Sequence, residues 1–218
     1  MEKAIVENVE ITLVFPCMRE FQVEERGKLL KKVDNWCEKR QTRVEILVND
    51  WGMTALVKES GKHLEPCLGV LLNKQKKDPR MRYKKGSTRG LGESNLQADF
   101  YRTFLKDTYG ITRYEWESCG YPQVFPQGKN SLHLPYYQTN TSQYCPLYAS
   151  CTEGERGKQR LPEHCPGYCE QYAYLYPEHL HMAGRYNSLF GLDAELVKHP
   201  EKLKAYQQAG IDRLVIGL

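Results

Sequence analysis

Four cysteines lie close together in the second half of the 218-residue chain, and thiolates are good ligands for soft metals. They are Cys145, Cys151, Cys165 and Cys169, with the spacing C-x5-C-x13-C-x3-C. Prolines and glycines along this stretch disfavour a long helix or strand. We therefore expect a metal-binding loop that holds zinc or an iron–sulfur cluster. Disulfides or free thiols are the alternative states of these cysteines.

The composition predicts a soluble, cytoplasmic protein without a membrane partner. No run of about 18 apolar residues occurs, and the charged start MEKAIVENVE does not resemble a signal peptide. In a reducing compartment, eight cysteines are more often metal ligands and buried thiols than disulfides. The chain is also long enough to form a hydrophobic core without disulfides or metals to stabilise it. Metal in the cysteine loop is thus expected to serve function rather than folding.

The elements that must position this loop alternate between strands and helices, which predicts an α/β fold with parallel strands. We expect strands over residues 9–16, 44–48, 67–72, 111–117, 131–138 and 213–216, extended segments over 172–176 and 181–192, and helices over 23–39, 51–59, 95–109 and 194–208. A complete TIM barrel takes about 250 residues, so we expect a partial or irregular TIM-like barrel. The chain forms one domain over 1–218, with barrel-like units over 1–138, the cysteine-rich loop over 139–170 and a closing β-α-β segment over 171–218.

Polar residues follow two of the expected strands. Asn49 and Asp50 end the second strand, and Asn73 and Lys74 end the third. In parallel sheets the carboxyl ends of the strands are where ligands bind, so these four residues are candidate site residues. Asp50 also stands where a residue that caps the next helix would stand, and capping alone would explain it.

Two further residues suit proton transfer. Glu115 and Glu117 alternate along the strand at 111–117, and a pair of glutamates can do acid–base chemistry when their environments differ. An outward-facing pair on an exposed edge is the ordinary alternative. His133 alternates with two leucines in the next strand. It can be a catalytic base, or a structural residue held by hydrogen bonds. Glu117 and His133 are therefore the candidate proton carriers.

Basic residues cluster between the third strand and the third helix, with Asp78 as the single acid among them. They are Lys74, Lys76, Lys77, Arg80, Arg82, Lys84, Lys85 and Arg89. Such a run suits phosphate or an acidic partner, and an ordinary solvated loop is the alternative. One hypothesis is therefore an RNA-binding module with a structural metal site, in which Lys76, Lys77, Lys84 and Lys85 contact phosphate.

Several stretches resemble one known family. ITLVFP, VEILVNDWG, LGVLLNKQKKDPR, RYEWE and SLHLPYY are similar to the later part of proteins of the collagenase-like peptidase family U-32, from Ile11 to the C-terminus. The resemblance implies a TIM-barrel-like fold and a 4Fe-4S cluster on Cys145, Cys151, Cys165 and Cys169, with Cys17 or Cys119 as substitutes for one ligand. It also implies oxygen-independent hydroxylation of quinone precursors or RNA bases, or peptidase activity.

The leading hypothesis is thus an iron–sulfur enzyme or enzyme subunit, with zinc as the alternative metal. It would catalyse oxygen-independent hydroxylation, or a related oxygen or sulfur transfer, on a small aromatic or nucleobase substrate. Lys74 or Arg80 would bind an anionic substrate, and a companion barrel subunit or a second copy would complete the barrel. A metal-dependent peptidase or hydrolase is a third hypothesis, although the six histidines form no H-x3-H pair.

Overall fold

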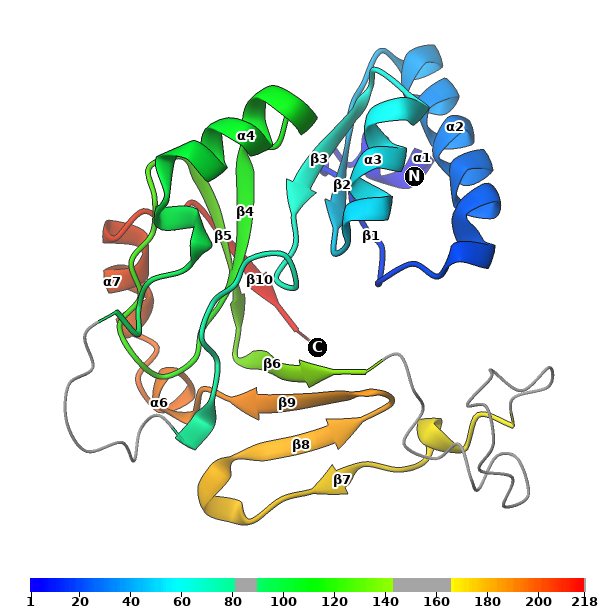
Figure 1. Cartoon of the computed structure of the whole chain (residues 1–218). Helices are drawn as coiled ribbons and strands as arrows, with labels where there is room; N and C mark the ends of the chain where they lie inside the picture. Colours follow the sequence, from blue (N-terminus) through cyan, green and yellow to red (C-terminus); the bar gives the residue numbers. More distant parts are fainter. Residues whose placement is uncertain (81–89, 143–165, 218) are drawn as a thin grey trace.

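Figure 1 shows the computed structural model, which describes residues 1–80, 90–142 and 166–217. Its larger sheet has six parallel strands in the order β1-β2-β3-β4-β5-β10. These are β1 (Thr12–Val14), β2 (Val44–Val48), β3 (Leu64–Leu68), β4 (Arg113–Glu117), β5 (Lys129–Leu134) and β10 (Arg213–Ile216). The predicted α/β fold with a partial parallel barrel is confirmed by this sheet.

Helices connect most of the parallel strands, and the long ones lie on the outer side of the curled sheet (Figure 1). The α-helices are α1 (Glu2–Val6), α2 (Val23–Arg40), α3 (Trp51–Ser60), α4 (Asp99–Tyr109), α6 (Ala194–Lys198) and α7 (Lys202–Gln208). Short 3-10 helices occur at η1 (Glu20–Gln22), η3 (Asn95–Gln97), η4 (Tyr168–Glu170) and η5 (Glu178–Leu180). Helix α2 buries Leu30, Val33 and Cys37 at helical spacing, and they share one core with the alternate β2 residues Val44 and Ile46. Apolar periodicity therefore directs one face of each element toward this core.

The parallel sheet is strongly curled, as one side-chain contact demonstrates. Arg213 on β10 donates from Nη2 to Oε1 of Glu45 on β2 at 2.7 Å, although four strand intervals separate β10 from β2. In a flat sheet these strands would lie roughly 19 Å apart, beyond the combined reach of the two side chains. The sheet is thus an open half-barrel, and residues facing its concave side meet across the opening.

A second sheet lies across the carboxyl ends of β4 and β5 (Figure 1). It is antiparallel, with the order β6-β9-β8-β7. Its strands are β6 (Tyr136–Thr141), β7 (Tyr174–Leu175), β8 (Met182–Arg185) and β9 (Ser188–Leu192). The expectation of a closing β-α-β segment over 171–218 missed this sheet, in which β7, β8 and β9 precede the helices and only β9 pairs with β6.

Several predicted boundaries were wrong, among them the first strand, which spans Thr12–Val14 instead of 9–16. Three of the differences have a clear physical cause. The third strand ends at Leu68 instead of residue 72, because the chain turns at Gly69 and donates from the Gly69 amide to the carbonyl oxygen of Val48. The strand predicted over 131–138 divides at Pro135 between the two sheets. The helix predicted over 194–208 is two helices separated at Pro200, since proline interrupts helical hydrogen bonding.

In the part of the chain that the structure describes, no helix is long and apolar enough to cross a membrane.

Candidate functional site

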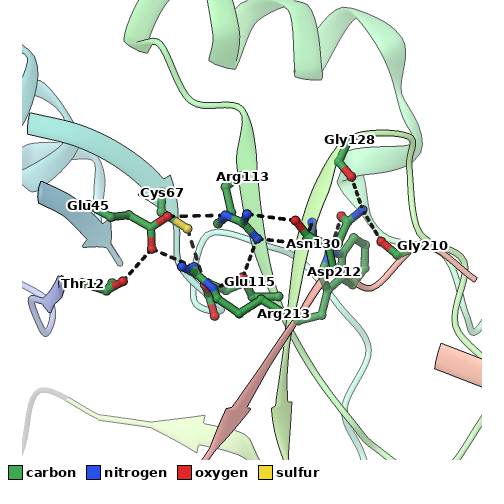
Figure 2. Close-up of polar contacts among 12 residues, drawn as sticks. Thr12, Glu45, Cys67, Arg113, Glu115, Gly128, Asn130, Gly210, Asp212 and Arg213 are labelled. Carbon is green, nitrogen blue, oxygen red and sulfur yellow. Dashed lines mark hydrogen bonds and ion pairs between the residues drawn. The ribbon is translucent and has the colours of Figure 1, made fainter. Parts of the chain in front are cut away.

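The concave face of the half-barrel carries a network of charged side chains in place of a fully apolar filling (Figure 2). Two carboxylates, from Glu45 on β2 and Glu115 on β4, accept hydrogen bonds from the same Arg213 guanidinium at 2.7 and 3.0 Å. Thr12 on β1 also donates to Glu45, at 2.9 Å. Strand alternation explains the arrangement, because each residue occupies an inward position of its strand.

A second arginine extends the network toward the amino end of the strands (Figure 2). Arg113 donates from both terminal nitrogens to the two carboxylate oxygens of Asp212, at 2.8 and 2.9 Å. Its Nε lies 3.4 Å from Glu45 Oε2. Ser131 on β5 accepts from Arg113 and from Arg213 at 3.1 and 2.9 Å. The planar guanidinium groups therefore hold β2, β4, β5 and β10 in one geometry.

The network keeps the carboxylates of Glu115 and Asp212 ionised. Burial opposes the charge of Glu115, but His133 and Arg213 outweigh that effect and lower the pKa of the carboxyl. Burial likewise opposes ionisation of Asp212, and Arg113 outweighs it, so the Asp212 pKa is also lowered. The pKa of Arg213 is raised, because Glu45 and Glu115 outweigh the effect of its burial. The concave face thus holds paired fixed charges.

His133 is a titratable side chain of this network that is partly exposed to solvent. Its Nε2 pairs with Oε2 of Glu115, whose side chain is only 1% exposed, while the imidazole is 30% exposed. Among the described residues no hydrogen bond to Nδ1 occurs. A buried carboxylate that orients an imidazole is the arrangement that many general bases use. The pair can therefore exchange a proton at Nδ1 with a molecule on the concave face.

One group in the network has the composition of a metal site, but its chemistry does not fit a cation. One ligand atom each from Glu45, Cys67 and Glu115 lie within 4.8 Å of one another. Both carboxylates are already bound to Arg213, whose positive charge occupies the place a cation would take. Burial and then Glu115 raise the pKa of the Cys67 thiol far above neutrality, so it stays protonated. We assign these residues to the ion-pair network.

Glu117 lies at the carboxyl end of β4, where the two sheets meet. Its carboxylate pairs with Nζ of Lys77 and accepts from the backbone amide of Gln138 on β6 at 2.8 Å. The side chains of Glu117 and Lys77 are 7% and 9% exposed. The outward-facing alternative for Glu115 and Glu117 was wrong, since both are buried. In this structure Glu117 joins the basic loop to the second sheet.

The other candidates at the strand ends also make structural contacts. Asp50 caps α3 by accepting from the Met53 amide at 2.7 Å, and it accepts from the Met18 amide at 2.7 Å as well. Asn49 donates to the carbonyl oxygen of Phe15 at 3.0 Å. The contacts with Met18 and with Phe15 tie the carboxyl end of β1 to that of β2. Capping therefore accounts for the position of Asp50.

Asn73 and Lys74 lie in the turn after β3. Asn73 is 2% exposed and donates to the carbonyl oxygen of Glu115 at 2.9 Å, so it lies beside the network residue. Its Oδ1 is buried without a hydrogen-bond partner among the described residues. Lys74 is exposed, and its charge partly offsets the effects of burial and of Asp50, which raise the pKa of the Cys17 thiol. The structure thus places Asn73 beside Glu115, the partner of His133, and Lys74 near the ends of β1 and β2.

Three of the four predicted metal ligands, Cys145, Cys151 and Cys165, lie outside the described residues. The fourth predicted ligand, Cys169, is described: it lies in η4, is partly exposed and forms no disulfide with the other described cysteines. The proposed substitutes differ from it. Cys17 is partly exposed, whereas Cys119 is buried, and burial raises the pKa of its thiol to about 11. Cys119 is therefore the less suitable thiolate ligand.

The basic run is only partly available for phosphate. Lys77 is buried against Glu117, and Arg80 pairs with Asp78 through Nη2 at 2.5 Å. Arg82, Lys84, Lys85 and Arg89 lie outside the described residues. Lys77 was therefore wrongly assigned to the phosphate contacts, since its charge is taken up inside the fold.

Sequence reasoning missed the two arginines and Glu45 of the concave network. A signal was present for Glu45, which stands between Val44 and Ile46 in a strand, at a position where a closed barrel would carry an inward side chain. The two arginines are the first residues of their strands and each follows a polar residue, so the alternating pattern did not mark them. Cys67 was placed in the third strand without a role. Only the pairing order of the strands, which pattern alone does not reveal, brings these residues together.

Comparisons with known proteins give the chain no family. No family model, no curated protein and no solved structure matches it.

Proposed function

We propose that this protein is an enzyme, or a subunit of one, that moves a proton on the concave face of its half-barrel. The observation that carries the proposal is the His133–Glu115 pair, a part-exposed imidazole on a buried, ionised carboxylate. Arg213 neutralises the second oxygen of Glu115, so the carboxylate orients the ring without being exposed itself. His133 Nδ1 would accept a proton from a bound molecule and return one to it.

The substrate class follows from the surroundings of His133. Asn73 follows β3 and donates to the carbonyl oxygen of Glu115, and its unpartnered buried Oδ1 supplies an acceptor beside the network. The next residue, Lys74, is exposed near the ends of β1 and β2 and suits an anionic group. A small anionic molecule, aromatic or nucleobase-like as the sequence resemblance implies, therefore remains the proposed substrate.

We retain the iron–sulfur cluster as part of the proposal, on Cys145, Cys151, Cys165 and Cys169. Support comes from their spacing and from Cys169, which is unpaired and partly exposed. The cysteine segment leaves the antiparallel sheet at Thr141 and returns before Tyr174, so the second sheet anchors it at both ends. A cluster there would supply Lewis-acid or electron-transfer chemistry. Anaerobic purification with iron and sulfide analysis tests it, and stoichiometric zinc would instead support the alternative metal.

We also propose that a companion chain or second copy completes the barrel. Strands β1 and β10 are the two edges of the parallel sheet, and each carries an exposed apolar residue, Val14 at 62% and Ile216 at 65%. Exposed edges of this kind pair readily with further strands. Size-exclusion chromatography with light scattering would show the mass of the assembly. A strictly monomeric protein that binds substrate would contradict the proposal that a second chain completes the barrel.

Proton transfer is tested directly by deuterium exchange. Phenylpyruvate is a small aromatic anion whose protons beside the carbonyl are acidic, so it serves as a probe in heavy water. We expect the protein to accelerate deuterium incorporation, and His133→Asn to remove about a hundredfold or more of that acceleration. His199→Asn is the matched control, since His199 is exposed and remote from the network. Equal exchange by the protein and His133→Asn would contradict the proposed role for this class of substrate.

A further inference from the structure

A groove separate from the concave face lies between the loop that follows β4 and helices α6 and α7. It has a volume of about 480 Å³, within the range of pockets that hold small molecules. Its walls include three aromatic side chains, Tyr121, Phe125 and Tyr206. Phe125 and Tyr206 lie with ring centroids 6.2 Å apart at an interplanar angle of 56°. The size and the aromatic walls suit one planar ring system.

Two polar side chains that line the groove, Gln123 and Asp193, offer hydrogen-bond acceptors. Gln123 donates from Nε2 to the carbonyl oxygen of Glu117 at 3.0 Å, which fixes the orientation of its amide. Its Oε1 is buried and has no hydrogen-bond partner among the described residues. Asp193 adds a buried carboxylate, which accepts from the amides of Leu196 and Gly120 at 3.1 and 3.2 Å. A buried acceptor without a partner is costly, and a ligand that donates to it removes that cost.

The charge of the groove selects against anions. Glu195 and Lys202 pair with each other at 3.1 Å, so the Asp193 carboxylate is the remaining net charge among the lining residues. Burial, and then Asp193, raise the pKa of the Tyr206 hydroxyl, so this phenol stays protonated at neutral pH. A neutral or cationic ring is therefore favoured over a carboxylate.

We propose that this groove binds a small planar aromatic molecule, neutral or cationic, that donates an N–H or O–H hydrogen bond to Gln123. The site does not depend on the proton-transfer proposal, because neither His133 nor Glu115 lines it. The ring would lie against Tyr121, Phe125 and Tyr206. The chemical class is that of indoles and aminated heteroaromatic rings.

The test uses three probes on the full chain, with dissociation constants from ligand-observed NMR. Indole carries the donor, 1-methylindole lacks it, and indole-3-carboxylate adds a negative charge. We expect 1-methylindole to bind about fivefold more weakly than indole, the usual effect of one lost hydrogen bond. Indole-3-carboxylate should bind more weakly than indole as well, because of Asp193.

Variants locate the binding. Ala205 and Ala209 are exposed residues that line the groove, so Ala205→Phe and Ala209→Phe should each fill it and lower indole affinity at least tenfold without disturbing the core. Ala173→Phe is the matched control, because Ala173 is exposed and does not line the groove. Absence of indole binding, equal affinity for indole and 1-methylindole, or indole affinity unchanged in both groove variants would each overturn the proposal.

Discussion

Replacing Arg213 with methionine should destabilise the protein more than any exposed charge could, because it leaves two carboxylates without their shared partner. Arg213 donates to Glu45 at 2.7 Å and to Glu115 at 3.0 Å, and the Glu115 side chain is only 1% exposed. Removal of one partner from a buried ion pair typically costs about 3–5 kcal/mol. Since the Arg213 side chain is 27% exposed, we expect a loss near the lower end, about 3 kcal/mol at pH 7.

The pH dependence of this loss has a definite sign. The pKa of Glu115 is lowered in the folded protein, so its contribution to stability is present above the unfolded pKa and is lost as the pH falls through the folded pKa. The Arg213→Met variant loses part of that contribution. Its stability deficit should therefore be largest above about pH 4.5 and shrink in more acidic solution.

Urea unfolding followed by circular dichroism measures both effects. Lys28→Met is the control, because Lys28 pairs with Glu24 on the surface of α2 and should contribute less than about 0.5 kcal/mol. The double variant Arg213→Met with Glu115→Gln should recover part of the loss, since the second change removes the unpaired buried charge. A deficit below about 1 kcal/mol, or one independent of pH, would refute the account of the concave network.

Three further changes test other parts of the structure. Asp50→Ala should destabilise the protein by about 1–2 kcal/mol in urea unfolding through loss of the α3 cap, and Asp50→Asn should retain more of the stability. Gly191→Ala should cost about 1–3 kcal/mol, because a Cβ there would lie 2.3 Å from Cζ of the fully buried Tyr137; an unchanged thermal midpoint would contradict this packing. Iodoacetamide should alkylate Cys169 much faster than Cys67, because Cys67 is fully buried and its thiol stays protonated. Mass spectrometry of the metal-free protein measures the two rates, and equal rates would contradict the exposures of the two side chains.

The parallel half of the fold was predictable because its strands and helices carry strong local patterns. Helix α2 and strand β2 occur close to where apolar periodicity placed them, at Val23–Arg40 and Val44–Val48. The antiparallel sheet was not predicted, since β7 spans only Tyr174–Leu175 and since β6 pairs with β9, which is distant from it in sequence. Short strands acquire their structure from pairing rather than from their own composition.

The candidate site was predictable only in part. His133 and Glu117 were named from the sequence, and both lie at the carboxyl ends of neighbouring strands. The residue that orients His133 is Glu115, which had been considered only as the partner of Glu117. Arg213 is separated from Glu45 by 168 positions, so their contact depends on the curl of the whole sheet. No local pattern encodes a contact of that kind.

The central claim is that His133 presents a free ring nitrogen to solvent on the concave face. Carbethoxylation with diethyl pyrocarbonate, read residue by residue by mass spectrometry on the native protein, tests it most directly. We expect His133 to react within about tenfold of His199, whose side chain is 48% exposed compared with 30% for His133. Modification of His199 with His133 left intact in the native protein would contradict the claim.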